Sequence, residues 1–113
     1  SLRLIAAPEV PARSPVKLGA NSPFQGITAI NISPAVKEEL SLSGIDSGVV
    51  VGEIEPGSAA EQVGFQKGDV IIAVNGQRIE ETGVLDRVAK TRNYLWRVTF
   101  NRGGQSFTTT LGG

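Results

Sequence analysis

The sequence contains no histidine and no cysteine. Without histidine, neither a Ser-His-Asp nor a Cys-His nucleophile system can form, and the usual general base near neutral pH is missing. Without cysteine, disulfides and thiolate metal sites are excluded, although this absence does not discriminate between cytosol and periplasm. We therefore expect that this chain alone is not an enzyme and that it folds without a cofactor or a metal.

A net charge of either sign and long apolar runs are also lacking. Eleven basic residues balance eleven acidic ones, so no overall field favours binding to nucleic acid or to an anionic membrane. No segment approaches the roughly eighteen apolar residues of a membrane span, and no signal peptide is recognisable. A length of 113 residues, 40% of them hydrophobic, suits one globular domain with one core. We expect a mature or excised fragment that is monomeric on its own.

The stretch over residues 55–76 organises the chain. Within it, Val70–Val74 is a continuous apolar run rich in β-branched residues, which predicts a strand buried on both faces. The following pair, Asn75-Gly76, accepts the positive φ angles of a tight hairpin turn, and Gln77–Ile79 is expected to form the return strand. The chain is therefore predicted to double back directly after a central strand.

Capping residues predict the helices. Ser58 is placed to cap a short helical turn that ends at Gly64, where a left-handed residue fits. Ser33, followed directly by proline, starts a second helix. The main helix is expected over residues 81–91 with Thr82 as its N-cap, because apolar positions repeat there at helical spacing. Alternation and β-branched content predict further strands at residues 2–5, 26–32, 49–54, 94–100 and 106–111.

Four pieces of the central stretch stand together in order: Glu55–Ala60, Gly64–Phe65, Lys67–Ile71 and Val74–Gly76. With this spacing they resemble the interior of a PDZ domain. The likeness extends over roughly residues 24–111 and is closest to the circularly permuted PDZ modules of the bacterial HtrA/Deg (Do-like) periplasmic serine proteases, in particular the second or C-terminal module. It implies an α+β, PDZ-like fold: a mostly antiparallel, five- to six-stranded, partly open barrel or sandwich with two helices.

The first 21 residues differ from the rest in composition. Three prolines within residues 8–15 forbid a helix and favour an extended, semi-rigid connector. We assign residues 1–21 to an N-terminal tail and Pro-rich linker, which by the resemblance includes the end of an upstream domain, and residues 22–113 to the PDZ domain. Two interpretations of the linker stay open, a mobile tail or partial docking on the domain.

The resemblance also implies a peptide-binding groove. In the family, the loop at Phe24–Ile27 grips a terminal carboxylate through its backbone N–H groups, and charge-assisted bonds of this kind need no basic side chain. Gln25 stands where many family members carry an apolar residue. The groove would lie between the strand at residues 26–30 and the main helix, whose Leu85 and Val88 would face the core. The implied peptide-binding residues are Phe24, Gln25, Gly26, Ile27, Thr28, Ala29, Ile30, Thr82, Asp86 and Ala89.

Two functions stay open once catalysis by this chain is set aside. The first is a peptide-binding module that captures extended segments or C-termini of protein substrates or regulators by strand addition. The second is an inter-domain or oligomer assembly module that does not bind free C-termini. The resemblance further implies an upstream trypsin-like protease domain, sibling PDZ domains as partners, and quality control of misfolded proteins in a bacterial periplasm.

Overall fold

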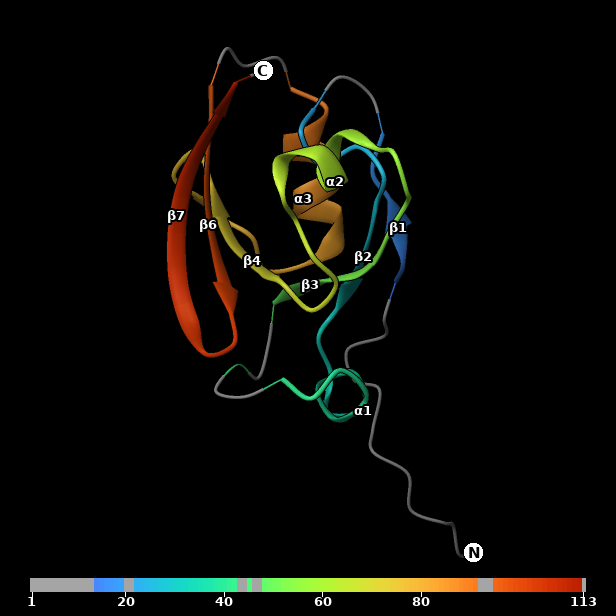
Figure 1. The fold of residues 1–113 in the computed structure, drawn as a ribbon. Coiled ribbons are helices and arrows are strands. Elements are labelled where there is room, and N and C mark those ends of the chain that lie inside the picture. The colour runs from blue at the N-terminus through green and yellow to red at the C-terminus, as the bar shows by residue number, and fades with distance from the viewer. Residues whose placement is uncertain (1–13, 20–21, 43–44, 46–47, 92–94, 113) are drawn as a thin grey trace, which may run out of the picture.

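The computed structural model describes residues 14–19, 22–42, 45, 48–91 and 95–112. Within them the chain forms a seven-stranded antiparallel sheet that does not close on itself, with three helices (Figure 1). The strands are β1 (Val16–Lys17), β2 (Ile27–Asn31), β3 (Val49–Ile54), β4 (Val70–Val74), β5 (Gln77–Arg78), β6 (Leu95–Arg102) and β7 (Gln105–Gly112). Their order is β1-β2-β3-β4-β6-β7, and β5 pairs with β4 beside this path. Five to six strands and two helices were expected; the structure exceeds both numbers because it adds the two-residue strands β1 and β5 and a five-residue helix at Ala59–Val63. The strand expected at residues 2–5 lies outside the described residues.

The helices are α1 (Pro34–Glu39), α2 (Ala59–Val63) and α3 (Thr82–Ala89). The capping predictions for the first two are confirmed: Ser33 Oγ accepts a hydrogen bond from the N–H of Val36, and Gly64 ends α2 in the left-handed region at φ 102°. α3 lies within the predicted range of residues 81–91 and ends at Ala89, but its N-cap is Glu81, one residue before the predicted Thr82. The Thr82 N–H instead donates to Asn31 Oδ1 at 2.8 Å, so a side chain from β2 satisfies this helix end.

The central strand β4 pairs with β3 on one edge and with β6 on the other. Val70 and Val74 are buried as predicted, whereas Ile72 is partly exposed, so the strand is not covered along its whole length. The predicted hairpin turn is confirmed, with φ of 52° at Asn75 and 82° at Gly76. The Asn75 side chain also accepts a 2.7 Å bond from the N–H of Arg97, which ties the turn to β6.

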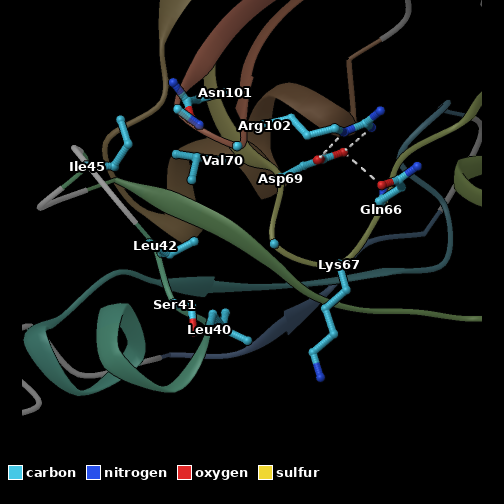
Figure 2. Close-up of a pocket in the computed structure, with 13 residues that line it drawn as sticks. Leu40, Ser41, Leu42, Ile45, Gln66, Lys67, Asp69, Val70, Asn101 and Arg102 are labelled. Atoms are coloured by element: carbon cyan, nitrogen blue, oxygen red, sulfur yellow. Dashed lines mark hydrogen bonds and ion pairs between the residues drawn. The ribbon is translucent and has the colours of Figure 1, made fainter.

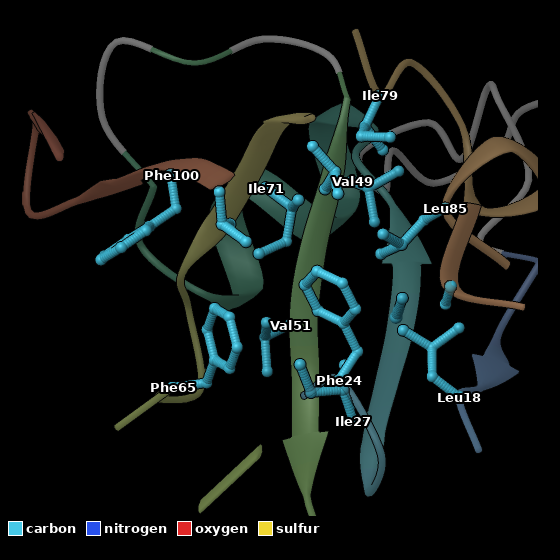
Figure 3. Packing of buried hydrophobic residues seen from close by; sticks show 14 of the residues in the cluster. Leu18, Phe24, Ile27, Val49, Val51, Phe65, Ile71, Ile79, Leu85 and Phe100 are labelled. Carbon is cyan, nitrogen blue, oxygen red and sulfur yellow. The ribbon is translucent and has the colours of Figure 1, made fainter. Parts of the chain in front are cut away.

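Buried apolar side chains form two clusters. The larger includes Phe24 and Trp96, both fully buried, whose rings meet edge to face with centroids 5.6 Å apart. Figure 3 shows Phe24 within this cluster. Trp96 is therefore a packed core residue and not an exposed contact for a partner. The smaller cluster joins α1 to the sheet through Val36, Val50 and Val70.

An ion pair fixes the turn that leads into β4. Arg102 donates from Nε and Nη2 to the two carboxylate oxygens of Asp69, each at 2.7 Å, and this carboxylate also accepts the N–H of Gln66 at 2.9 Å (Figure 2). Arg102 Nη2 reaches the carbonyl of Gly64 at 3.0 Å as well. The hydrogen bonds to Asp69 raise the pKa of the Arg102 guanidinium above its already high ordinary value. The start of β4, the end of α2 and the end of β6 are thereby held together.

Candidate functional site

The outer edge of β2 is the strand edge that the sequence assigns to the groove. On its other side β2 pairs with β3, with an irregularity in register between Thr28 and Ala29. On the groove side it pairs with β1, where Val16 lies opposite Ala29 and Lys17 opposite Thr28. Figure 1 shows β1 beside β2 at this end of the sheet. A segment of the same chain therefore lies along the edge of β2.

Backbone hydrogen bonds continue this pairing into the loop. The N–H of Leu18 donates to the carbonyl of Ile27 at 2.8 Å, and the N–H of Gly26 donates to the carbonyl of Leu18 at 3.0 Å. The Leu18 side chain is 1% exposed and belongs to the larger core cluster (Figure 3). Leu18, which the sequence analysis placed in the linker, is thus both hydrogen-bonded to the predicted carboxylate loop and buried in the core.

The helix α3 forms the second wall of the site. It contacts both β1 and β2. Thr82 is buried, and its hydroxyl donates to the carbonyl of Ser14 at 2.9 Å. Leu85, Val88 and Ala89 are buried in the same cluster as Leu18. The helix therefore contributes polar contacts to Asn31 and Ser14 at its first residue, and an apolar surface through Leu85, Val88 and Ala89.

The backbone donors of the predicted carboxylate loop have partners within the chain. The N–H of Gln25 donates to the carbonyl of Ser22 at 3.2 Å, and the N–H of Ile27 donates to the carbonyl of Phe24 at 3.0 Å. Together with the bond from Gly26 to Leu18, these contacts shape the loop into a compact turn. Of these three loop amides, Gly26 is the one whose hydrogen bond runs to Leu18, the residue after β1, and not to the loop itself, so an arriving carboxylate would replace this contact.

Gln25 ties the loop to α2. Its side-chain oxygen accepts the N–H of Ala59 at 3.0 Å, and its backbone carbonyl accepts the N–H of Ala60 at 3.0 Å. These are donors of the first helical turn, which have no partner within a helix. The side-chain bond to Ala59 gives a physical reason for a glutamine at this position, where the sequence analysis expected an apolar residue in many members of the family.

Gly26 lies against Ser58, the N-cap of α2. Its φ is 99°, and an added Cβ would lie 2.1 Å from Ser58 Cβ, well inside contact distance. Glycine is required here for two reasons, the left-handed backbone and the close approach of the capping serine. A larger residue at this position would disturb the packing of the loop on α2 before it affected a bound peptide.

The remaining predicted site residues divide by the face of the sheet. Ile27 and Ala29 are buried towards the core that α3 covers, whereas Thr28 and Ile30 are only partly buried. On α3, Asp86 forms an ion pair with Lys90 at 3.1 Å. Of the predicted set, the structure thus brings Phe24, Ile27 and Ala29 into one cluster with Ala89 of α3.

The opposite face of this end of the sheet is polar. Lys17 Nζ lies 2.6 Å from a carboxylate oxygen of Glu55, and both side chains are largely exposed. Their hydrogen bond and opposite charges raise the pKa of Lys17 above its ordinary value of 10.5. Thr28 and Glu53 line the same hollow of about 520 Å³ as this pair. The alternating side chains of β1 therefore point one towards the core and one towards this charged rim.

Sequence reasoning missed three residues that the structure places at the site: Ser14, Val16 and Leu18. The available signal was the alternation of Val16, Lys17 and Leu18 directly after Pro15. Within the part of the chain that the structure describes, no three acidic side chains gather in a way suited to a metal ion, and no helix is long and apolar enough to cross a membrane.

Comparisons with known families and proteins place this geometry in context. The family model described as PDZ domain matches residues 24–100. The periplasmic serine endoprotease DegP of Escherichia coli is 37% identical over 65 residues, which cover 58% of this chain and 14% of DegP. Human serine protease HTRA3 is 34% identical over 77 residues, covering 64% of this chain and 17% of HTRA3. The chain thus spans only a small part of the curated relatives that it matches.

Two solved structures show the same architecture. The crystal structure of the HtrA3 PDZ domain bound to a phage-derived ligand (FGRWV) matches with a TM-score of 0.65 and 26% identity, covering 77% of this chain and 80% of that one. The HtrA-type protease AlgW with a decapeptide matches with a TM-score of 0.66 and 27% identity, covering 77% of this chain and 27% of that one. What the chain shares with these proteases is a PDZ domain.

Proposed function

The chain belongs to the PDZ domain family, and from that premise we propose that it binds extended peptides or protein C-termini as the non-catalytic module of an HtrA/Deg-type serine protease. The peptide adds as an antiparallel strand to β2, with alternate side chains facing α3 and its terminal carboxylate at Phe24–Ile27. Main-chain hydrogen bonds supply affinity, and the apolar surface beneath supplies selectivity.

One observation carries this proposal: the outer edge of β2 already accepts an antiparallel strand in front of α3. β1 makes that pairing, and the Gly26 N–H points at a carbonyl of the paired segment. An edge with this geometry has both the backbone groups and the apolar wall that strand addition requires.

The comparisons support the proposal from outside the chain. The similar HtrA3 PDZ domain carries a ligand whose sequence, FGRWV, ends in an apolar residue, and similar AlgW carries a decapeptide. Similar DegP proteins are periplasmic endoproteases, which supports a periplasmic parent protein with an upstream protease domain and a role in protein quality control. The parent's substrates and its sibling PDZ domains belong to the same proposal.

The proposal is tested by titrating ¹⁵N-labelled protein with pentapeptides that end in valine or leucine, each as a free acid and as an amide. We expect saturable amide shifts at residues 26–30 and 82–89. The acid should bind about one to two orders of magnitude more tightly than the amide, because a charge-assisted hydrogen bond contributes roughly 1.5 to 3 kcal/mol. Equal binding of acid and amide would remove the carboxylate loop from the proposal.

A second function, docking between domains without capture of free C-termini, is favoured by one observation. The edge of β2 is covered by β1, so a partner that binds elsewhere would leave this pairing intact. If the chain has this second function, no peptide changes the amide chemical shifts of residues 26–30 at any concentration, and these shifts change only when the parent's other domains are added.

A further inference from the structure

The groove proposed above is filled by the chain itself. We infer that Ser14–Leu18, the internal ligand, occupies the position of a bound peptide, that an external peptide has to displace it, and that its side chains define what the groove selects. This inference rests on the proposed function and adds to it the regulation and the ligand class of the same site.

The backbone of the internal ligand runs as a bound peptide would. It is antiparallel to β2 and reaches the loop with Leu18 last. The Leu18 N–H donates to Ile27 O at 2.8 Å, and its carbonyl accepts the Gly26 N–H at 3.0 Å. This carbonyl therefore takes the loop amide that the sequence analysis assigns to a terminal carboxylate. Leu18 lies where the last residue of a ligand would lie.

The side chains of the internal ligand indicate which residues the groove selects. Leu18 is 1% exposed in the core cluster that includes Leu85 and Val88 of α3. Val16, two residues earlier, is partly buried against the same cluster, whereas Lys17 points to the charged rim at Glu55. The groove therefore fits a segment with leucine or a similar apolar residue at its end and another apolar residue two positions before.

Tethering makes the internal ligand an effective competitor. A segment joined to its site through a short stretch of chain acts at an effective concentration in the millimolar range. The apparent dissociation constant of an external peptide equals its intrinsic value divided by the fraction of molecules in which the groove is open. Binding should therefore tighten when the internal ligand is released and vanish when it is fixed.

The internal ligand can be fixed with one engineered disulfide. The chain has no cysteine of its own that could form a competing disulfide. Lys17 and Thr28 are opposite each other. Hydrogen-bonded and non-hydrogen-bonded pairs alternate along an antiparallel ladder, and Leu18 is hydrogen-bonded to Ile27. The preceding pair, Lys17 and Thr28, is therefore non-hydrogen-bonded, and its typical Cα separation of about 4.5 Å lies within the range for disulfides. The locked variant, which carries Lys17→Cys and Thr28→Cys together, is compared with itself, oxidised and reduced.

A second disulfide serves as the control. Thr99 and Thr108 face each other across β6 and β7, with their hydroxyl oxygens 3.1 Å apart. The variant that carries Thr99→Cys and Thr108→Cys joins two strands at the other end of the sheet. Its oxidation should leave peptide binding unchanged.

Releasing the internal ligand uses a matched pair of proline variants. By alternation from Leu18, the Val16 N–H faces β2 and the Lys17 N–H faces away. Val16→Pro removes a donor to β2, whereas Lys17→Pro introduces the same ring without removing one. Leu18→Ser, which empties the apolar pocket, is the second releasing variant. Melting followed by the fluorescence of buried Trp96 shows which variants are folded.

The probe is the peptide Ser-Pro-Val-Lys-Leu with a free carboxylate, a copy of the internal ligand that ends at its leucine. We expect Val16→Pro and Leu18→Ser to bind it at least tenfold more tightly than Lys17→Pro. The locked variant should lose binding when it is oxidised and regain it when it is reduced. If its oxidised and reduced forms bind equally, the internal ligand is not a competitor, and this inference is wrong while the proposed function stands. If no form binds any peptide, both are wrong.

Discussion

The bond between Arg102 and Asp69 gives a sharp test of what holds the turn before β4 (Figure 2). The Asp69 side chain is 1% exposed and that of Arg102 is 36% exposed. Replacing Arg102 by methionine removes two hydrogen bonds of 2.7 Å and leaves the buried carboxylate with the Gln66 N–H as a donor. The variant also loses the guanidinium that lies 5.1 Å from the centroid of the Phe100 ring.

The expected loss follows from burial. Removing one partner of a fully buried pair costs about 3 to 5 kcal/mol. Solvent reaches Arg102, so water can replace part of the lost interaction, and we expect about 2 to 3 kcal/mol here. For a domain of this size that lowers the melting temperature by about 10 °C. Arg102→Lys should lose less, because it keeps the charge but not the two-pronged hydrogen bonding.

Thermal and urea unfolding followed by Trp96 fluorescence measure this loss. Arg78→Met is the matched control, because the Arg78 side chain is 80% exposed and its Nε lies 3.7 Å from a Glu80 carboxylate oxygen. An exposed pair of this kind contributes little. If Arg102→Met and Arg78→Met have the same melting temperature, Arg102 does not stabilise the buried carboxylate of Asp69, and the reasoning is wrong.

Three further outcomes follow from single positions. Val74→Asp places an unpaired charge at a fully buried site in β4 and should abolish the cooperative melt; a near-parental melt would contradict the buried position. Gly26→Ala should destabilise more than Gly57→Ala, since both have positive φ but only at Gly26 would the added Cβ lie 2.1 Å from a side-chain carbon, and equal melting temperatures would contradict this. Because the hydrogen bond and charge of Glu55 raise the pKa of Lys17, the contribution of this pair is full below the ordinary value of 10.5 and is lost only as pH rises through the raised pKa. Hydrogen-exchange protection factors of β1 should therefore stay constant from about pH 6 to 9, and a change within that range would point to another group.

Local signals explain why most of the fold was predictable. Ser33 and Ser58 cap helices, and Asn75 and Gly76 adopt positive φ, because each of these conformations depends on the residue itself and its near neighbours. The N-cap of α3 differs by one residue from the prediction for the opposite reason. Its first donor is satisfied by Asn31 from β2, and a contact 51 positions away leaves no local pattern.

The loop of the candidate site was predictable in place but not in its contacts. The loop at Phe24–Ile27 was expected to grip a terminal carboxylate through its backbone N–H groups. In the structure its Gly26 makes room for Ser58, and its Gln25 bonds to the first turn of α2. A substitution at Gly26 therefore tests the packing of the loop on α2. Carboxylate recognition is tested more directly by comparing peptides with a free and an amidated C-terminus.

Leu18 shows why the occupied groove was hard to predict from the sequence. The alternation of Val16, Lys17 and Leu18 is too short to distinguish a strand from the rest of a proline-rich stretch, and Leu18 is buried only because β2 and α3, distant in sequence, form a surface that accepts it. We expect a peptide that supplies the same contacts to compete for that surface. At Gly26, Leu18 offers a neutral carbonyl, whereas a free C-terminus offers a carboxylate, and charge-assisted bonds are roughly twice as strong as neutral ones. On our proposal, the tether favours the internal ligand and the charge favours the external one, so we expect the groove to exchange its occupant for partners that end in a free apolar residue.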